Sequence, residues 1–79
     1  MTQKGREELE DLIMRSEDII YTADCLKRDI RKFYTMEEDV EDIDANERLT
    51  NAVLAMKEVA FRAECAMHEM QGALNVSRS

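Results

Sequence analysis

The sequence contains no proline and no tryptophan, and only two glycines, two cysteines and one histidine among its 79 residues. Because proline and glycine most often interrupt helices, their scarcity predicts long helices with few turns. The sequence also lacks a glycine-rich phosphate loop and a nucleophile elbow, so we expect neither enzymatic activity nor a cofactor. Two cysteines in a short chain without a disulfide framework are typical of a reducing compartment.

Long apolar runs and positive charge are scarce as well. No stretch approaches the ~18 apolar residues that a membrane-spanning helix needs, and residues 1–4 lead into charged sequence without a signal-peptide pattern. The net charge is −7, and acidic proteins are repelled by phosphate backbones and by anionic membrane surfaces. We therefore expect a cytoplasmic protein that binds neither nucleic acid nor a membrane.

The first half of the chain has the apolar periodicity of a helix. Apolar and small residues recur there at alternating spacings of three and four, which places them on one helix face. The spacing predicts a helix from about residue 6 to about residue 34 that packs through this seam. The seam comprises Leu9, Leu12, Ser16, Ile19, Ala23, Leu26, Ile30 and Phe33, and is widened on one side by Ile13, Ile20 and Tyr34.

Residues 35–46 are dominated by acidic side chains and predict a connection that contains a short helical turn and reverses the chain. One continuous bent helix is the alternative. The run from Asp42 through Asp44 to Asn46 resembles the start of a calcium loop, but Glu47 stands where such a loop needs glycine. A solvated turn that caps the next helix is the better interpretation.

The second half predicts another helix, from about residue 47 to about residue 74. Its seam is rich in alanine, so the two helices can approach closely but bury little apolar area. We predict a single all-α domain over residues 1–79, an antiparallel two-helix hairpin packed like a coiled coil. The second seam comprises Leu49, Ala52, Met56, Val59, Ala63, Ala66, Met70 and Ala73, and is widened by Val53, Ala60, Met67 and Leu74.

The two predicted helices resemble each other at an offset of 40 residues, which aligns the only two cysteines, Cys25 and Cys65. Two amphipathic helices that share a phase explain this similarity, and an internal duplication is the alternative. Cys65 also lies one turn before His68, but zinc needs three or four ligands. In a hairpin Cys25 and Cys65 are ~15 Å apart along the axis, which is too far for a shared metal site or an internal disulfide.

Two groups of residues fall opposite the predicted seams, at spacings of seven and four. A hairpin would turn them outward on opposite sides, where an aromatic side chain with Met, Leu and Cys beside it predicts a partner-binding surface. Scattered surface hydrophobes are the alternative. We call these groups the outer trios: Met14, Tyr21 and Cys25 in the first helix, and Leu54, Phe61 and Cys65 in the second.

The layout resembles the small needle co-chaperones of type III secretion systems, the YscE/SsaE-like family. The resemblance lies in the opening residues 1–3, the segment Leu9-Glu10-Asp11-Leu12, then Ser16, and the heptad run through Ile19, Leu26 and Ile30. It implies a cytoplasmic helical hairpin that binds a tetratricopeptide-type chaperone. Together such a pair keeps the needle subunit soluble before export.

The leading interpretation is therefore a non-enzymatic co-chaperone or adaptor that acts by helix packing. A second interpretation is a small acidic inhibitor that mimics nucleic acid through residues 37–47. A third is a homodimeric four-helix bundle with a structural role. Salt dependence distinguishes the first two, because phosphate mimicry weakens steeply as salt rises and apolar packing does not.

Overall fold

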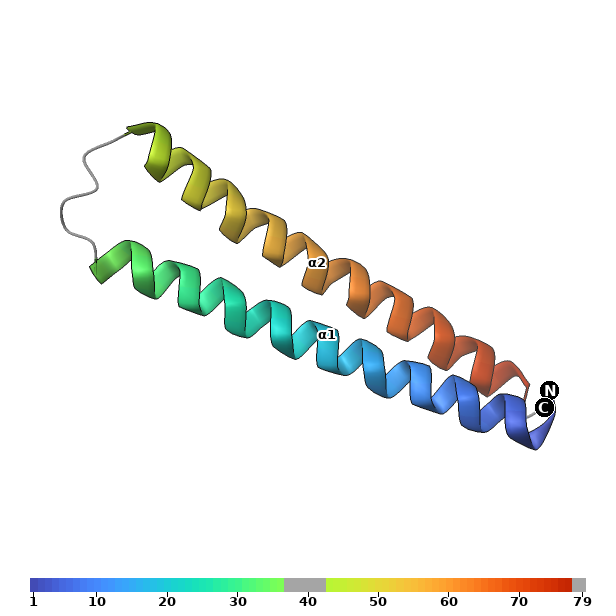
Figure 1. Cartoon of the computed structure of the whole chain (residues 1–79). Helices are drawn as coiled ribbons and strands as arrows, with labels where there is room; N and C mark the ends of the chain where they lie inside the picture. Colours follow the sequence, from blue (N-terminus) through green and yellow to red (C-terminus); the bar gives the residue numbers. More distant parts are fainter. Residues whose placement is uncertain (37–42, 78–79) are drawn as a thin grey trace.

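The structure is a computed structural model that describes residues 1–36 and 43–77. Helix α1 spans Gln3–Met36 and helix α2 spans Ile43–Val76. The helices run antiparallel, with the two termini together at one end of a rod that measures 58 × 15 × 12 Å (Figure 1). The described residues contain no strand. The predicted all-α hairpin is confirmed.

Both helices extend beyond the bounds expected from the sequence. The early start of α1 is explained by Thr2, whose hydroxyl accepts a hydrogen bond from the backbone N–H of Gly5 at 3.0 Å. This is the geometry of an N-cap, which satisfies an otherwise unpaired N–H in the first turn. At the other end of the connection, α2 begins at Ile43, so Asp44 lies inside its first turn and is not a preceding cap. The expected helical turn falls largely in residues 37–42, outside the described residues.

The core between the helices is thin. The apolar side chains classed as buried among the described residues are Ile13, Ala23 and Leu74, at 8%, 5% and 8% exposure. Ser16 is buried beside them, and its hydroxyl donates to the carbonyl of Leu12 at 3.0 Å, so its polar group is satisfied within α1. Ile13, Ser16 and Leu74 lie toward the end where α1 starts, Ala23 lies near the middle of α1, and the ribbons separate toward the connection (Figure 1).

The helices meet through a seam different from the predicted one. Leu12, Ile19, Leu26 and Phe33 were expected in the α1 seam but are 44%, 51%, 46% and 52% exposed. In α2 the expected members Val59, Ala66 and Ala73 are exposed as well. The observed seam is the set of buried and half-buried residues that recur every three and four positions. It comprises Leu9, Ile13, Ser16, Ile20, Ala23, Lys27 and Ile30 in α1, and Leu49, Val53, Met56, Ala60, Ala63, Met67, Met70 and Leu74 in α2.

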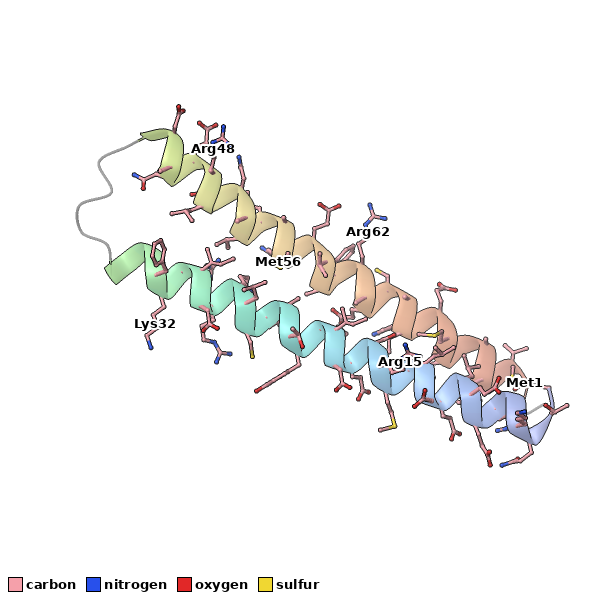
Figure 2. The ribbon with its side chains drawn as sticks, in the orientation of Figure 1. Met1, Arg15, Lys32, Arg48, Met56 and Arg62 are labelled. Atoms are coloured by element: carbon pink, nitrogen blue, oxygen red, sulfur yellow. The ribbon has the colours of Figure 1, made fainter. Side chains whose placement is uncertain are left out.

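The difference has a simple geometrical cause. Every second member of the predicted seam, such as Leu9 or Ala23, belongs to the observed seam too. The two seams differ only in the row that accompanies these shared residues, which lies on one side of them in the predicted seam and on the other side in the observed seam. Each helix is apolar over a face wider than one neighbouring helix can cover. In the structure, α1 faces α2 through the row that was expected only to widen the seam. Figure 2 shows Met56 pointing from α2 toward α1, while Lys32 and Arg62 point away from the other helix.

Half-buried Ala63 tests whether the alanines of α2 set the helix spacing. We expect Ala63→Leu to lower the free energy of unfolding by roughly 1–3 kcal/mol, because a larger side chain in a closely packed seam forces the helices apart. The measurement is urea unfolding followed by circular dichroism. The matched control is Ala55→Leu, at an exposed position of the same helix. Equal midpoints for both variants would contradict the observed seam.

Candidate docking surfaces

The outer trios lie on the surface, as expected. Met14, Tyr21, Leu54 and Phe61 are 64%, 71%, 55% and 62% exposed. Of the two thiols, that of Cys65 is exposed and that of Cys25 is half-buried. Their exposure leaves these side chains accessible to a partner, and their role as a binding surface stays a prediction.

Two members of the trios, Met14 and Leu54, border hollows on the same side of the hairpin. Met14 borders a hollow that also contacts Leu74, and Leu54 borders another that also contacts Ile30. Both hollows therefore bridge the two helices, and both are lined by polar residues from the same flanking rows. The two trios follow the outer edges of one flank. The other flank carries neither of them.

That other flank is the principal surface that the sequence interpretation missed. It consists of two rows with seven-residue spacing, one on each helix, and the rows contain only apolar residues. Its large side chains are about half exposed, including Val59 at 41%. We call it the apolar flank: Leu12, Ile19, Leu26 and Phe33 on α1, with Ala52, Val59, Ala66 and Ala73 on α2.

The two rows share one side of the hairpin. Ile19 and Leu26 of α1 line a single shallow hollow together with Val59 of α2, and seam residues Ala23 and Met56 form its floor. In an antiparallel helix pair, the rows that precede corresponding seam positions fall on the same side of the seam. The apolar flank is therefore a continuous surface that crosses both helices.

The opposite flank is chemically different. Its rows, at the same seven-residue spacing, carry charged or polar residues at the four levels of each helix that correspond to the apolar flank. Such residues are well solvated, so this flank has no need of a covering element. We call it the polar flank: Glu10, Glu17, Asp24 and Arg31 on α1, with Thr50, Lys57, Glu64 and Gln71 on α2.

The described residues bring together no group of three His, Cys, Asp or Glu side chains that could hold a metal ion. His68 lies on the surface, with its Nε2 3.9 Å from a carboxylate oxygen of Glu64. Asp44 and Asn46, from the segment that resembles a calcium loop, lie within α2. Helical backbone does not wrap around an ion as that loop does.

Neither described helix contains a segment apolar enough to cross a membrane. Comparison with known proteins gives no relative: no protein-family model, curated protein or solved structure matches this chain. Function must therefore be argued from the surfaces themselves.

The two thiols provide a direct test of the outer edges. We expect Cys65 to react several-fold faster than Cys25 with a disulfide reagent such as dithionitrobenzoate, because reaction requires access to the sulfur. Reaction rates of Cys25→Ser and Cys65→Ser, each with one remaining thiol, give the comparison. Faster reaction of Cys25 would show that α1 is rotated from the position described. An intrachain disulfide in the wild-type chain would contradict the outward placement of the thiols.

Proposed function

We propose that this chain is a non-enzymatic, protein-binding co-chaperone or adaptor that acts by packing its helices against those of another protein. The observation that supports the proposal is the surface that the hairpin leaves uncovered. Its accessible surface is 6385 Å², whereas a compact monomer of 9.2 kDa exposes about 4,900 Å². The excess includes large apolar side chains on both helices, which are characteristic of protein–protein contact sites.

The energetics favour a protein that functions when bound. Seam residues such as Ser16, Ala23 and Ala60 remove little apolar area from water, so the isolated hairpin has a small margin of stability. Any partner that binds only the folded hairpin stabilises it by mass action. A concave helical-repeat surface fits a rod of two helices, since it can contact one edge along its length.

The finer part of the proposal follows from the family resemblance given above. The partner would be a tetratricopeptide-type chaperone in the cytoplasm, and the pair would hold an apolar, polymerising subunit such as a secretion needle protein before export. We assign the contact to the outer trios, with Tyr21 of α1 as its centre. Tyrosine combines apolar area with a hydroxyl and is enriched where proteins bind one another, and Met14 beside it adapts to different partner surfaces.

Substitution of Tyr21 tests the contact. We expect Tyr21→Asp to reduce partner capture at least 100-fold while the helical circular dichroism spectrum is retained, because a charge would be buried at the contact. Tyr21→Phe is the matched control and should bind nearly as well as wild type. The measurement is affinity capture from the source cytoplasm at high salt, with mass-spectrometric identification of what is retained.

The same capture distinguishes the other functions. A helical-repeat protein together with a small apolar client, both retained at high salt and lost with Tyr21→Asp, would support the co-chaperone. A nuclease or polymerase retained only at low salt would instead favour mimicry of nucleic acid. Equal capture by wild type and Tyr21→Asp would exclude the outer trios as the contact.

A further inference from the structure

The apolar flank requires an occupant of its own, because the proposed partner contact lies on the outer edges beside the polar flank. Its two rows differ in size in a regular way. The α1 row contains Leu12, Ile19, Leu26 and Phe33, and the α2 row contains three alanines and Val59. One row therefore projects and the other is recessed, along the whole length of the flank.

The register of the hairpin places each large residue beside a small one. Ile13 shares a hollow with Leu74, Leu26 shares one with Val59, and Ile30 shares one with Val53. Continued along the two helices, this register pairs members of the two flank rows at four levels. The pairs are Leu12 with Ala73, Ile19 with Ala66, Leu26 with Val59, and Phe33 with Ala52.

A second copy of the same hairpin fits this surface. A two-fold axis parallel to the helices, placed between two facing flanks, sets the α1 row of each copy over the α2 row of the other. Projecting side chains then enter the recessed row at every level, as knobs enter holes in a coiled coil. An axis perpendicular to the helices would set α1 on α1, where large residues meet large ones and alanines meet alanines.

The charges at the edge of the flank agree with this arrangement. Leu12 shares a hollow with Lys4, Glu7, Glu8, Asp11 and Arg15, and Asp18 lines the hollow beside Ile19, so charges of both signs border the flank. The row next to the flank on each helix, which we call the rim, is balanced although the chain carries a net charge of −7. The rim consists of three acids, Glu8, Asp29 and Glu69, and three bases, Arg15, Arg48 and Arg62.

The parallel axis also brings opposite charges together across the interface. In the register described above, Arg15 of one copy lies at the level of Glu69 of the other. A perpendicular axis would bring Arg15 to the level of Asp29 of the other copy, but it would also set the two copies of Arg62 against each other near the axis. Surface ion pairs contribute little affinity, but they do discriminate between alternative orientations.

The area of the flank lies at the lower end of the range for specific dimer interfaces. From Leu12 to Phe33 the flank runs ~30 Å along two helices that are each ~10 Å wide. Its flat footprint is therefore about 600 Å², and the uneven surface of the side chains adds to this area. A standard interface buries about 800 Å² on each partner. The hairpin exposes 6385 Å², about 1,500 Å² more than a compact chain of its mass, so this area can be covered.

We propose that the apolar flank is a homodimer interface, through which two hairpins form an antiparallel four-helix bundle with each α1 packed on the α2 of the other copy. The dimer leaves the polar flank and the outer trios of both copies exposed. This inference stands independently of the proposed co-chaperone function.

The mass of the full chain in solution is the first test. Sedimentation equilibrium should give twice 9.2 kDa for wild type. Leu26→Glu should weaken the dimer at least 100-fold, because its carboxylate would be buried at the centre of the interface. Thr50→Glu, which adds the same charge at an exposed position of the polar flank, should remain dimeric. A wild-type monomer at about 100 µM would overturn the proposal, as would a dimer that Leu26→Glu leaves intact.

Crosslinking tests the orientation without disturbing the fold. In a background of Cys25→Ser and Cys65→Ser, a chain with Ile19→Cys is mixed with a chain with Ala66→Cys and oxidised. The parallel axis predicts a disulfide between the two chains, since it brings these positions within the ~7 Å between Cα atoms that the bond requires. Crosslinking of Ile19→Cys to Leu26→Cys chains instead would show the perpendicular axis and overturn the arrangement.

Reversal of the rim charges provides the remaining control. Arg15→Glu alone and Glu69→Arg alone should each weaken the dimer several-fold, and the double variant should recover most of the loss. Recovery requires that the two residues meet across the interface, because they lie on different helices and form no salt bridge with each other in the described part of one chain. Additive losses in the double variant would overturn the assigned pairing.

Discussion

The width of the apolar face on each helix is the constraint on which the rest of this structure depends. A helix that contacts one neighbour needs two largely apolar rows, but α1 carries three: the two rows of the seam, in which Ser16 and Lys27 are the polar members, and the row Leu12, Ile19, Leu26 and Phe33. One antiparallel neighbour covers the first two. The third row stays half in water, and the hairpin therefore folds into a unit that is incomplete on one side.

The seam itself, in contrast to these wide apolar faces, is built partly from small residues. Ser16, Ala23, Ala60 and Ala63 occupy positions where larger side chains would bury more area. A buried serine is tolerated because its hydroxyl bonds to the carbonyl of Leu12 and leaves no unsatisfied group. Small seam residues let the helices approach, but they leave large apolar side chains exposed on the apolar flank. Intermolecular contact through that flank can therefore add to the stability of the folded hairpin.

The hairpin and its all-α character could be predicted because every local feature agrees with them: no proline, few glycines, and two long periodic segments around an acidic connection. The phase of the seam could not be predicted so directly. Leu9, Ser16, Ala23 and Ile30 belong to both candidate seams, and the periodicity within one helix does not decide between the rows at either side. Only the requirement that two helices satisfy one register at once selects Ile13 and Ile20 over Leu12 and Ile19.

The start of α1 was missed for a different reason. Thr2 lies two helical turns before Leu9, the first apolar residue of the periodic series. The apolar periodicity therefore gave no indication that the helix begins directly after Thr2. A hydroxyl residue near a terminus followed by uninterrupted helix formers is sufficient to predict a cap. The outer trios, by contrast, were identified correctly as exposed apart from half-buried Cys25, because positions far from either candidate seam stay outside whichever row is chosen.

The asymmetry between the two flanks also limits how far assembly can proceed. If both flanks were apolar, hairpins would stack through alternate faces into an open filament. The polar flank carries carboxylates such as Glu10, Glu17 and Glu64 that lose hydration if they are covered by another copy. A pair of hairpins joined through the apolar flank therefore presents only polar flanks and outer edges, and contact with a third copy becomes unfavourable. What remains accessible on that closed unit is the edge that holds Met14 and Tyr21, so self-association and recognition of a different protein can coexist on the same short chain.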